Sequence, residues 1–130
     1  MKIVIVGAGI FTAEDLVGYT VSPLWRKATR NMTMAAASIE RALESSGLAV
    51  RGNPEVGLVL GSSSGELETS AEFMSTLAKS AMARPLLFQN SLHNATTGFA
   101  SIAFQLTGPS FTVSVGENTP EECLRMAGTA

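Results

Sequence analysis

The chain has 130 residues and a formal net charge of −2, from nine Lys and Arg against eleven Asp and Glu. This length is typical of one domain, a hydrophobic share of 45% excludes a disordered chain, and the lack of a basic excess argues against a nucleic-acid binder. The single cysteine, Cys123, excludes an internal disulfide and a cysteine-based zinc site, and no apolar run reaches the ~20 residues that cross a bilayer. We therefore expect a cytoplasmic protein with no membrane partner and no cofactor.

The first half of the chain alternates β-branched runs with an amphipathic segment. Ile3–Val6 predicts a strand covered on both faces, closed by the turn Gly7-Ala8-Gly9. After an irregular stretch, Asn31 is expected to cap a helix that stops at Gly47. A second buried strand is predicted over residues 56–60. The apolar stripe of the predicted helix consists of Met32, Ala36, Ile39 and Leu43.

The middle of the chain predicts two further helices. Thr69 and Glu72 have the spacing of a capping box, which predicts a helix running to about Met82. Pro85 breaks the chain and is followed by a short apolar run of undefined type. Asn94 is expected to cap the next helix, which Gly108-Pro109 ends.

The last segment predicts a strand and a helix. Residues 111–115 form the third predicted strand, and Thr119 with Glu122 makes a second capping box that opens the final helix. The resulting order, β-α-β-α-α-β-α, predicts an α/β fold with a mostly parallel sheet.

Two glycine-rich turns suggest chemistry. Gly7-Ala8-Gly9 follows a strand, as in a dinucleotide-binding fingerprint, but Thr12 stands at the position of the third glycine. A plain tight turn is the favoured interpretation, with a nucleotide-binding Rossmann-like module as an alternative. Gly61-Ser62-Ser63-Ser64-Gly65 matches the nucleophile elbow of serine hydrolases, with Ser63 as the nucleophile.

The partners that a serine hydrolase needs are poorly placed in this sequence. His93 is the only histidine, and the only aspartate, Asp15, lies upstream of Ser63 instead of between Ser63 and His93. A flexible turn is therefore the favoured interpretation of the loop, and a hydrolase that uses Ser63 stays as an alternative. Cys123 lies past the first turn of its helix and beside acidic residues, which predicts a packed, unreactive thiol.

The order and spacing of several short motifs resemble a known family. Val56–Gly61, the loop at Gly65, Ser91-Leu92-His93-Asn94-Ala95 and Gly108-Pro109-Ser110 are similar to the N-terminal half of β-ketoacyl synthases, the condensing enzymes of the thiolase superfamily. The resemblance covers nearly all of residues 1–130. It implies a thiolase-like half domain, with a mostly parallel mixed sheet and helices on both faces, that is incomplete relative to the family's two-half fold.

The resemblance also bears on catalysis. It places the family's nucleophilic cysteine nine residues after Gly108, where this sequence has Glu117, so no catalytic residue is assigned. It matches His93 and Asn94 to a pair that lies near the site but outside the chemistry. A carboxylate cannot form the acyl thioester that condensation needs. The protein is thus similar to chain-length-factor subunits, which implies a non-catalytic partner or scaffold in fatty-acid, polyketide or aryl-polyene biosynthesis.

The resemblance further implies association. In the family, the strand before the nucleophile position pairs antiparallel with its mate across a two-fold axis, and here that strand consists of Phe111, Thr112, Val113, Ser114 and Val115. The expected partner is a second copy of the chain or a synthase-type subunit, with acyl carrier protein as a further partner.

Overall fold

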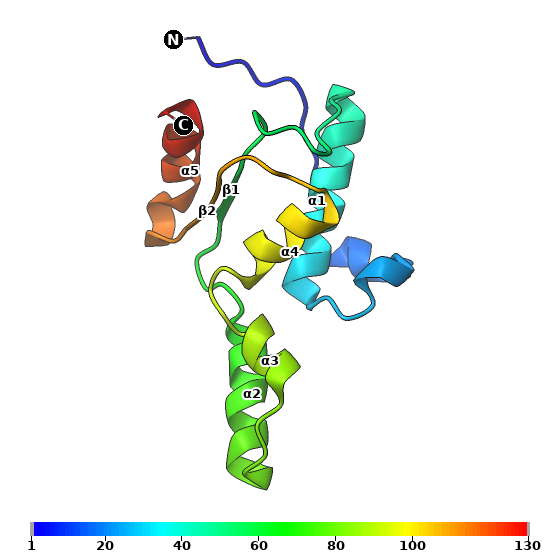
Figure 1. The fold of residues 1–130 in the computed structure, drawn as a ribbon, viewed down its shortest axis with the longest axis vertical. Coiled ribbons are helices and arrows are strands. Elements are labelled where there is room, and N and C mark those ends of the chain that lie inside the picture. The colour runs from blue at the N-terminus through cyan, green and yellow to red at the C-terminus, as the bar shows by residue number, and fades with distance from the viewer. Residues whose placement is uncertain (1, 130) are drawn as a thin grey trace.

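Two short parallel strands and five α-helices form the part of the chain that the structure describes, residues 2–129 of a computed structural model (Figure 1). The strands β1 (Leu58–Gly61) and β2 (Ser110–Val113) pair in parallel, with Leu58 opposite Ser110 and Gly61 opposite Val113. The α-helices are α1 (Arg30–Ser46), α2 (Leu67–Ser80), α3 (Pro85–Asn90), α4 (Ala95–Ala103) and α5 (Thr119–Thr129). Three short 3-10 helices are η1 (Glu14–Leu16), η2 (Pro23–Trp25) and η3 (Gly116–Asn118).

Each face of the strand pair is covered by one helix, as Figure 1 shows. On one face, α5 approaches so closely that a Cβ added to Gly61 would lie 2.6 Å from Cys123 Sγ. On the other face, the hydroxyls of Thr97 in α4 and Thr112 in β2 share a hydrogen bond of 2.6 Å. The expected α/β fold with helices on both faces is therefore confirmed, with two strands in place of the predicted three.

The apolar core lies between α1, α4 and the 3-10 helix η2. Trp25, Ala36 and Phe104 form its buried cluster, and the indole of Trp25 meets the ring of Phe99 edge-on at 6.2 Å between centroids. The predicted stripe of α1 is confirmed, because its residues are buried or packed against this cluster. Its members are Met32, Ala36, Ile39 and Leu43.

The N-terminal segment departs from the prediction. Ile3–Val6 is not a strand: no strand of the described residues pairs with it, and its side chains are 59–80% exposed. The chain instead runs over α1, where a Cβ on Gly9 would lie 2.3 Å from the carbonyl oxygen of Ser38. The β-branched composition is typical of extended backbone, but a strand also needs a neighbour in register, which this segment lacks.

The helix starts also differ from those predicted. Thr29, and not Asn31, is the N-cap of α1, and its hydroxyl accepts a hydrogen bond from the N–H of Met32 at 3.1 Å. Helix α2 begins at Leu67, so Thr69 lies inside its first turn and makes no capping box with Glu72. The N-cap position of Asn94 is confirmed, although its side chain makes no capping hydrogen bond, and α4 ends at Ala103 instead of continuing to Gly108.

Helices α2 and α3 form an arm that projects from the rest of the molecule (Figure 1). The rings of Phe73 and Phe88 join the two helices at 5.6 Å between centroids. Within the arm, residues 67–90, the one buried residue is Thr69, which lies where α2 meets the body. Most of the large apolar side chains of the arm are exposed, namely Leu67, Met74, Leu77, Met82, Leu86 and Phe88.

The close approach of the N-terminal segment to α1 predicts that Gly9 tolerates no side chain. Gly9→Ala should lower the free energy of unfolding by about 1–3 kcal/mol, the usual cost of overpacking, because the new Cβ would meet Ser38 and Ala42. The matched control is Gly98→Ala, where a Cβ meets open space and should stabilise α4 by about 0.5–1 kcal/mol. Urea unfolding measures both, and a Gly9→Ala variant as stable as the parent would contradict the contact.

Candidate functional site

The carboxyl ends of β1 and β2 define one end of the molecule. Because Gly61 and Val113 are register partners, the loops that leave the two strands start side by side, and the N–H of Ser62 donates to the carbonyl of Val113 at 3.0 Å. Ligands of open α/β sheets bind outside this edge. Two features expected from the sequence therefore lie at one end: the Gly61–Gly65 loop and Glu117.

The loop after β1 is built around Gly65. Its φ of +56° is in the left-handed region that favours glycine, and a Cβ there would lie 2.5 Å from Nδ1 of His93. The hydroxyl of Ser62 accepts a hydrogen bond from the N–H of Gly65 at 2.8 Å and closes the turn. The exposed imidazole of His93 thus lies directly over the loop. This contact and the positive φ explain why a glycine is needed at position 65, so the motif requires no nucleophile at Ser63.

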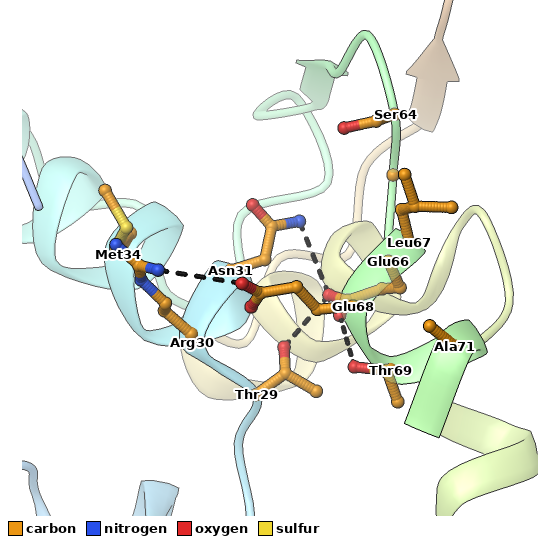
Figure 2. Close-up of a pocket in the computed structure, with 11 residues that line it drawn as sticks. Thr29, Arg30, Asn31, Met34, Ser64, Glu66, Leu67, Glu68, Thr69 and Ala71 are labelled. Carbon is orange, nitrogen blue, oxygen red and sulfur yellow. Dashed lines mark hydrogen bonds and ion pairs between the residues drawn. The ribbon is translucent and has the colours of Figure 1, made fainter. Parts of the chain in front are cut away.

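Glu66 follows as a buried carboxylate with only 4% of its surface exposed. Its Oε2 accepts from the hydroxyl of Thr69 at 3.0 Å. Its Oε1 accepts from the hydroxyl of Thr29 at 3.0 Å, from Nδ2 of Asn31 at 3.4 Å and from the hydroxyl of Thr96. Figure 2 shows the Thr29, Asn31 and Thr69 side chains gathered around this carboxylate from different helices.

The electrostatics of this cluster come from three helix starts. Thr29 is the N-cap of α1, Glu66 is the N-cap of α2, and Thr96 is the second residue of α4. The N-terminus of a helix carries a partial positive charge, so three helix N-termini together favour the Glu66 carboxylate as an anion. Its donors are hydroxyl and amide groups of neutral side chains. A carboxylate with four donors has most of its acceptor sites already occupied.

A cavity of about 470 Å³ lies beside the cluster. The ion pair between Arg30 and Glu68, 3.7 Å from Nη1 to Oε1, is part of its lining, with both side chains exposed (Figure 2). The cavity is lined by Thr29, Arg30, Asn31, Met34, Ser64, Gly65, Glu66, Leu67, Glu68, Thr69 and Ala71. Its carboxylate is already satisfied, so the lining assembles neither a nucleophile with a base nor a metal site. No group of three metal-ligating side chains is found within residues 2–129.

Glu117 lies in the short turn between β2 and α5, two residues before α5 begins. It is exposed in η3, directly after Gly116, whose φ is +67°. The hydroxyl of Thr119 accepts from the N–H of Val115 at 3.0 Å and donates to the carbonyl of Gly116 at 2.8 Å. These two bonds fold the chain sharply between β2 and α5, and Glu117 lies within this turn.

Cys123 is a half-buried thiol, as predicted. It lies in the fifth position of α5 and packs against Gly61 of β1. Burial raises the pKa of this thiol, and the negative charge of Glu122 raises its pKa further. The thiolate is therefore disfavoured, and Cys123 does not replace a nucleophile at position 117.

The other candidates of the sequence are not brought together. In the described part of the chain no hydrogen bond joins Ser63 to His93. Asp15 contacts neither residue: its carboxylate accepts a hydrogen bond from the N–H of Thr12 at 2.9 Å and forms an ion pair with Arg41 at 3.1 Å. The triad of a serine hydrolase is not assembled. Gly9 packs closely on α1.

Sequence reasoning missed the Glu66 cluster. A glutamate that follows a glycine-rich loop carries no local signal of burial, and its donors come from residues 29, 31, 69 and 96. The threonines at positions 29, 69 and 96 have no common sequence motif. The signal that was available, polar residues near helix starts, predicted caps instead.

The chain belongs to the β-ketoacyl synthase family, since the model of the family's N-terminal domain matches residues 27–128. The mixed α/β fold described above is that of ketosynthase domains, as the motif resemblance implied. The matched residues contain both strands, helices α1 to α4, η3 and all of α5 except its last residue, and they leave out η1 and η2. No curated protein matches the chain.

Solved structures support the same fold. A chain of the structure of ketosynthase (ApeO) in complex with its chain length factor (ApeC), from Xenorhabdus doucetiae, is 25% identical and has a TM-score of 0.64, with 85% of this chain and 44% of that chain covered. The ishigamide ketosynthase/chain length factor structure has a chain that is 22% identical with a TM-score of 0.68, with 92% of this chain and 35% of that chain covered. The present chain therefore spans less than half the length of either.

One further finding concerns membranes. Among the helices of residues 2–129, none combines the length and the hydropathy needed to cross a bilayer.

The environment of Cys123 predicts its reactivity with an alkylating reagent. Because its pKa is raised, the thiolate fraction at pH 8 is below that of an ordinary cysteine, and the labelling rate should rise only above the usual pKa. Glu122→Gln removes the nearby charge and should lower the pH midpoint of labelling. Glu121→Gln is the matched control and should leave the midpoint unchanged. Iodoacetamide kinetics against pH measure all three proteins, and equal midpoints for both variants would contradict this account.

Proposed function

We propose that this chain supplies the ketosynthase-like N-terminal part of a non-catalytic, chain-length-factor-like subunit, which works beside an active ketosynthase. The observation that carries the proposal is Glu117 at the start of α5, the position that the family resemblance gives to the nucleophile. A carboxylate there cannot form a thioester with an acyl chain, so the partner supplies the cysteine. The pathway proposed is of the fatty-acid, polyketide or aryl-polyene type.

The structural neighbours support this proposal. Each is a structure of a ketosynthase together with a chain length factor. A subunit that lacks its own nucleophile has a use in such an assembly, as one wall of a site that its partner completes. We further propose acyl carrier protein as the source of the acyl groups delivered to the complex.

The surroundings of Glu117 favour a structural role for its charge. Its side chain is exposed, and the free N–H groups at the start of α5 favour an anion at this position. The two hydrogen bonds of Thr119 hold the backbone of the turn in which Glu117 lies, directly before α5. The charge therefore stabilises the start of α5, while the chemistry is left to the partner.

The outer edge of β2 is the surface proposed for the partner. In a parallel pair, alternate residues point their backbone groups at the neighbour. Pro109 and Val113 accept from β1, so Thr112 and Ser114 direct theirs to the opposite, open edge. Phe111 and Val115 are 41% and 52% exposed along the same stretch. An unpaired apolar edge of this kind readily adds another strand.

The absence of a nucleophile at Glu117 predicts that the protein takes no acyl group. Incubation of the full chain with an acyl thioester should leave its mass unchanged by intact mass spectrometry, with no adduct on Ser63 or Cys123. Cys123→Ala is the control for non-specific transfer to the thiol. An acyl adduct that appears on the wild-type protein and also on the Cys123→Ala variant would overturn the non-catalytic assignment.

The open edge of β2 predicts the effect of removing one outward donor. Ser114→Pro should abolish association, because proline has no N–H at this exposed position, whereas Ser114→Ala keeps the N–H and should associate normally. Phe111→Lys should also weaken association, with Ile102→Lys as the control, since Ile102 is exposed on α4 and lines a cavity with Leu24 of η2.

Light scattering measures the mass of the full chain, alone and co-expressed with a ketosynthase subunit. Unchanged mass of the Ser114→Pro complex would place the partner on another surface. Val113 is unsuitable as a test position because it is buried, so a lysine there would disturb the fold itself.

A further inference from the structure

The arm formed by α2 and α3 lacks an apolar core that would hold it to the body. Inside it the rings of Phe73 and Phe88 pack together, and its single buried residue is Thr69 at the base. Helix α2 packs mainly on α3, and α3 touches the body through α4. A helical hairpin attached in this way gains little direction from hydrophobic burial.

Polar contacts gather instead at the base of the arm. The hydroxyl of Ser70 in α2 donates to the carbonyl of Ser91 at 3.1 Å, and Ser91 lies in the segment that connects α3 to α4. Arg30 and Glu68 form an ion pair at 3.7 Å between α1 and α2, but both side chains are more than half exposed. Exposed ion pairs of this kind contribute little, because water screens them and the long side chains lose entropy.

The Glu66 carboxylate differs from these contacts because it is buried and joins arm to body. One oxygen, Oε2, is held by Thr69 of the arm, and the other, Oε1, is held by Thr29, Asn31 and Thr96 of the body. The two oxygens of one rigid, planar group thus have separate partners. Rotation of α2 about its first turn would pull Thr69 away from Oε2 or pull Oε1 away from its three donors.

The geometry points to Glu66 as the positioning residue of the arm: we propose that its carboxylate, held from the arm on one oxygen and from the body on the other, sets the direction in which α2 and α3 project. Hydrogen bonds to an ionised acceptor are the strong ones, and their loss in a buried place leaves the donors without partners. This role is separate from the proposed function, since it concerns the orientation of the arm and not the identity of a partner.

Substitutions at the two oxygens separate positioning from general stability. Glu66→Ala removes both oxygens and should free the arm. Glu66→Gln keeps one oxygen for the three body donors, and its amide can donate to the hydroxyl of Thr69, which should preserve the direction. Thr69→Val is isosteric and removes only the donor of the arm, so it should free the arm while the body contacts stay. Glu68→Ala is the matched control on the exposed ion pair.

Pulsed electron resonance between two spin labels measures the direction of the arm in the full chain. The labels are attached at Ala78→Cys on α2 and Glu44→Cys on α1, both exposed positions, in a Cys123→Ala background. The parent, Glu66→Gln and Glu68→Ala should give one narrow distance distribution, whereas Glu66→Ala and Thr69→Val should give broad ones. Amide hydrogen exchange should become about tenfold faster or more in α2 with Thr69→Val, while α1 stays protected.

Two results would overturn the proposal. A narrow distance distribution for both the Thr69→Val variant and the Glu66→Ala variant would show that other contacts fix the arm. Exchange that rises equally in α1, α2 and α4 with Thr69→Val would show that Glu66 serves stability in general. Should Glu66→Ala fail to fold, Thr69→Val decides the matter by itself, because it leaves the three body donors on Oε1.

Discussion

A single buried carboxylate connects the helices that carry the fold. Glu66 receives hydroxyl and amide donors at the starts of α1, α2 and α4, so the orientation of three helices depends on one group. Helix α1 builds the core with Trp25, and α4 covers one face of the strands. The charge is buried without a cation because the positive ends of the helices and four donors replace the water that it loses.

The sequence could predict those parts of the fold that rest on local periodicity. The stripe of α1, with Met32 and Ala36 as its buried residues, follows from 3.6-residue spacing and is confirmed. The strand at 56–60 and the strand at 111–115 were placed within a few residues of β1 and β2. A pattern of this kind reports which face a residue takes, but it does not report the partner across a sheet. Ile3–Val6 therefore has the composition of a strand, but it pairs with no strand in the described part of the chain.

The caps of α1 and α2 could not be predicted because the same side chains have two uses. Asn31 and Thr69 are residue types that accept from free N–H groups at a helix start, which is why caps were expected there. Both also carry donors, and in the folded chain both donate to Glu66 instead. A buried acceptor from a distant part of the chain thus competes with the local backbone, and sequence spacing contains no information about that competition.

The position of Glu117 links the proposed chemistry to the proposed interface. Val113 ends β2, and the bonds of Thr119 turn the chain directly from the strand edge into α5. A strand that pairs with the open edge at Ser114 would fix the end of β2 and, through this short turn, the start of α5. In the proposed complex, the partner would therefore hold the N-terminus of α5 in place. In that proposal, a glutamate beside the helix start would supply an anion that the free N–H groups of α5 favour, so the turn would keep its geometry without a nucleophile.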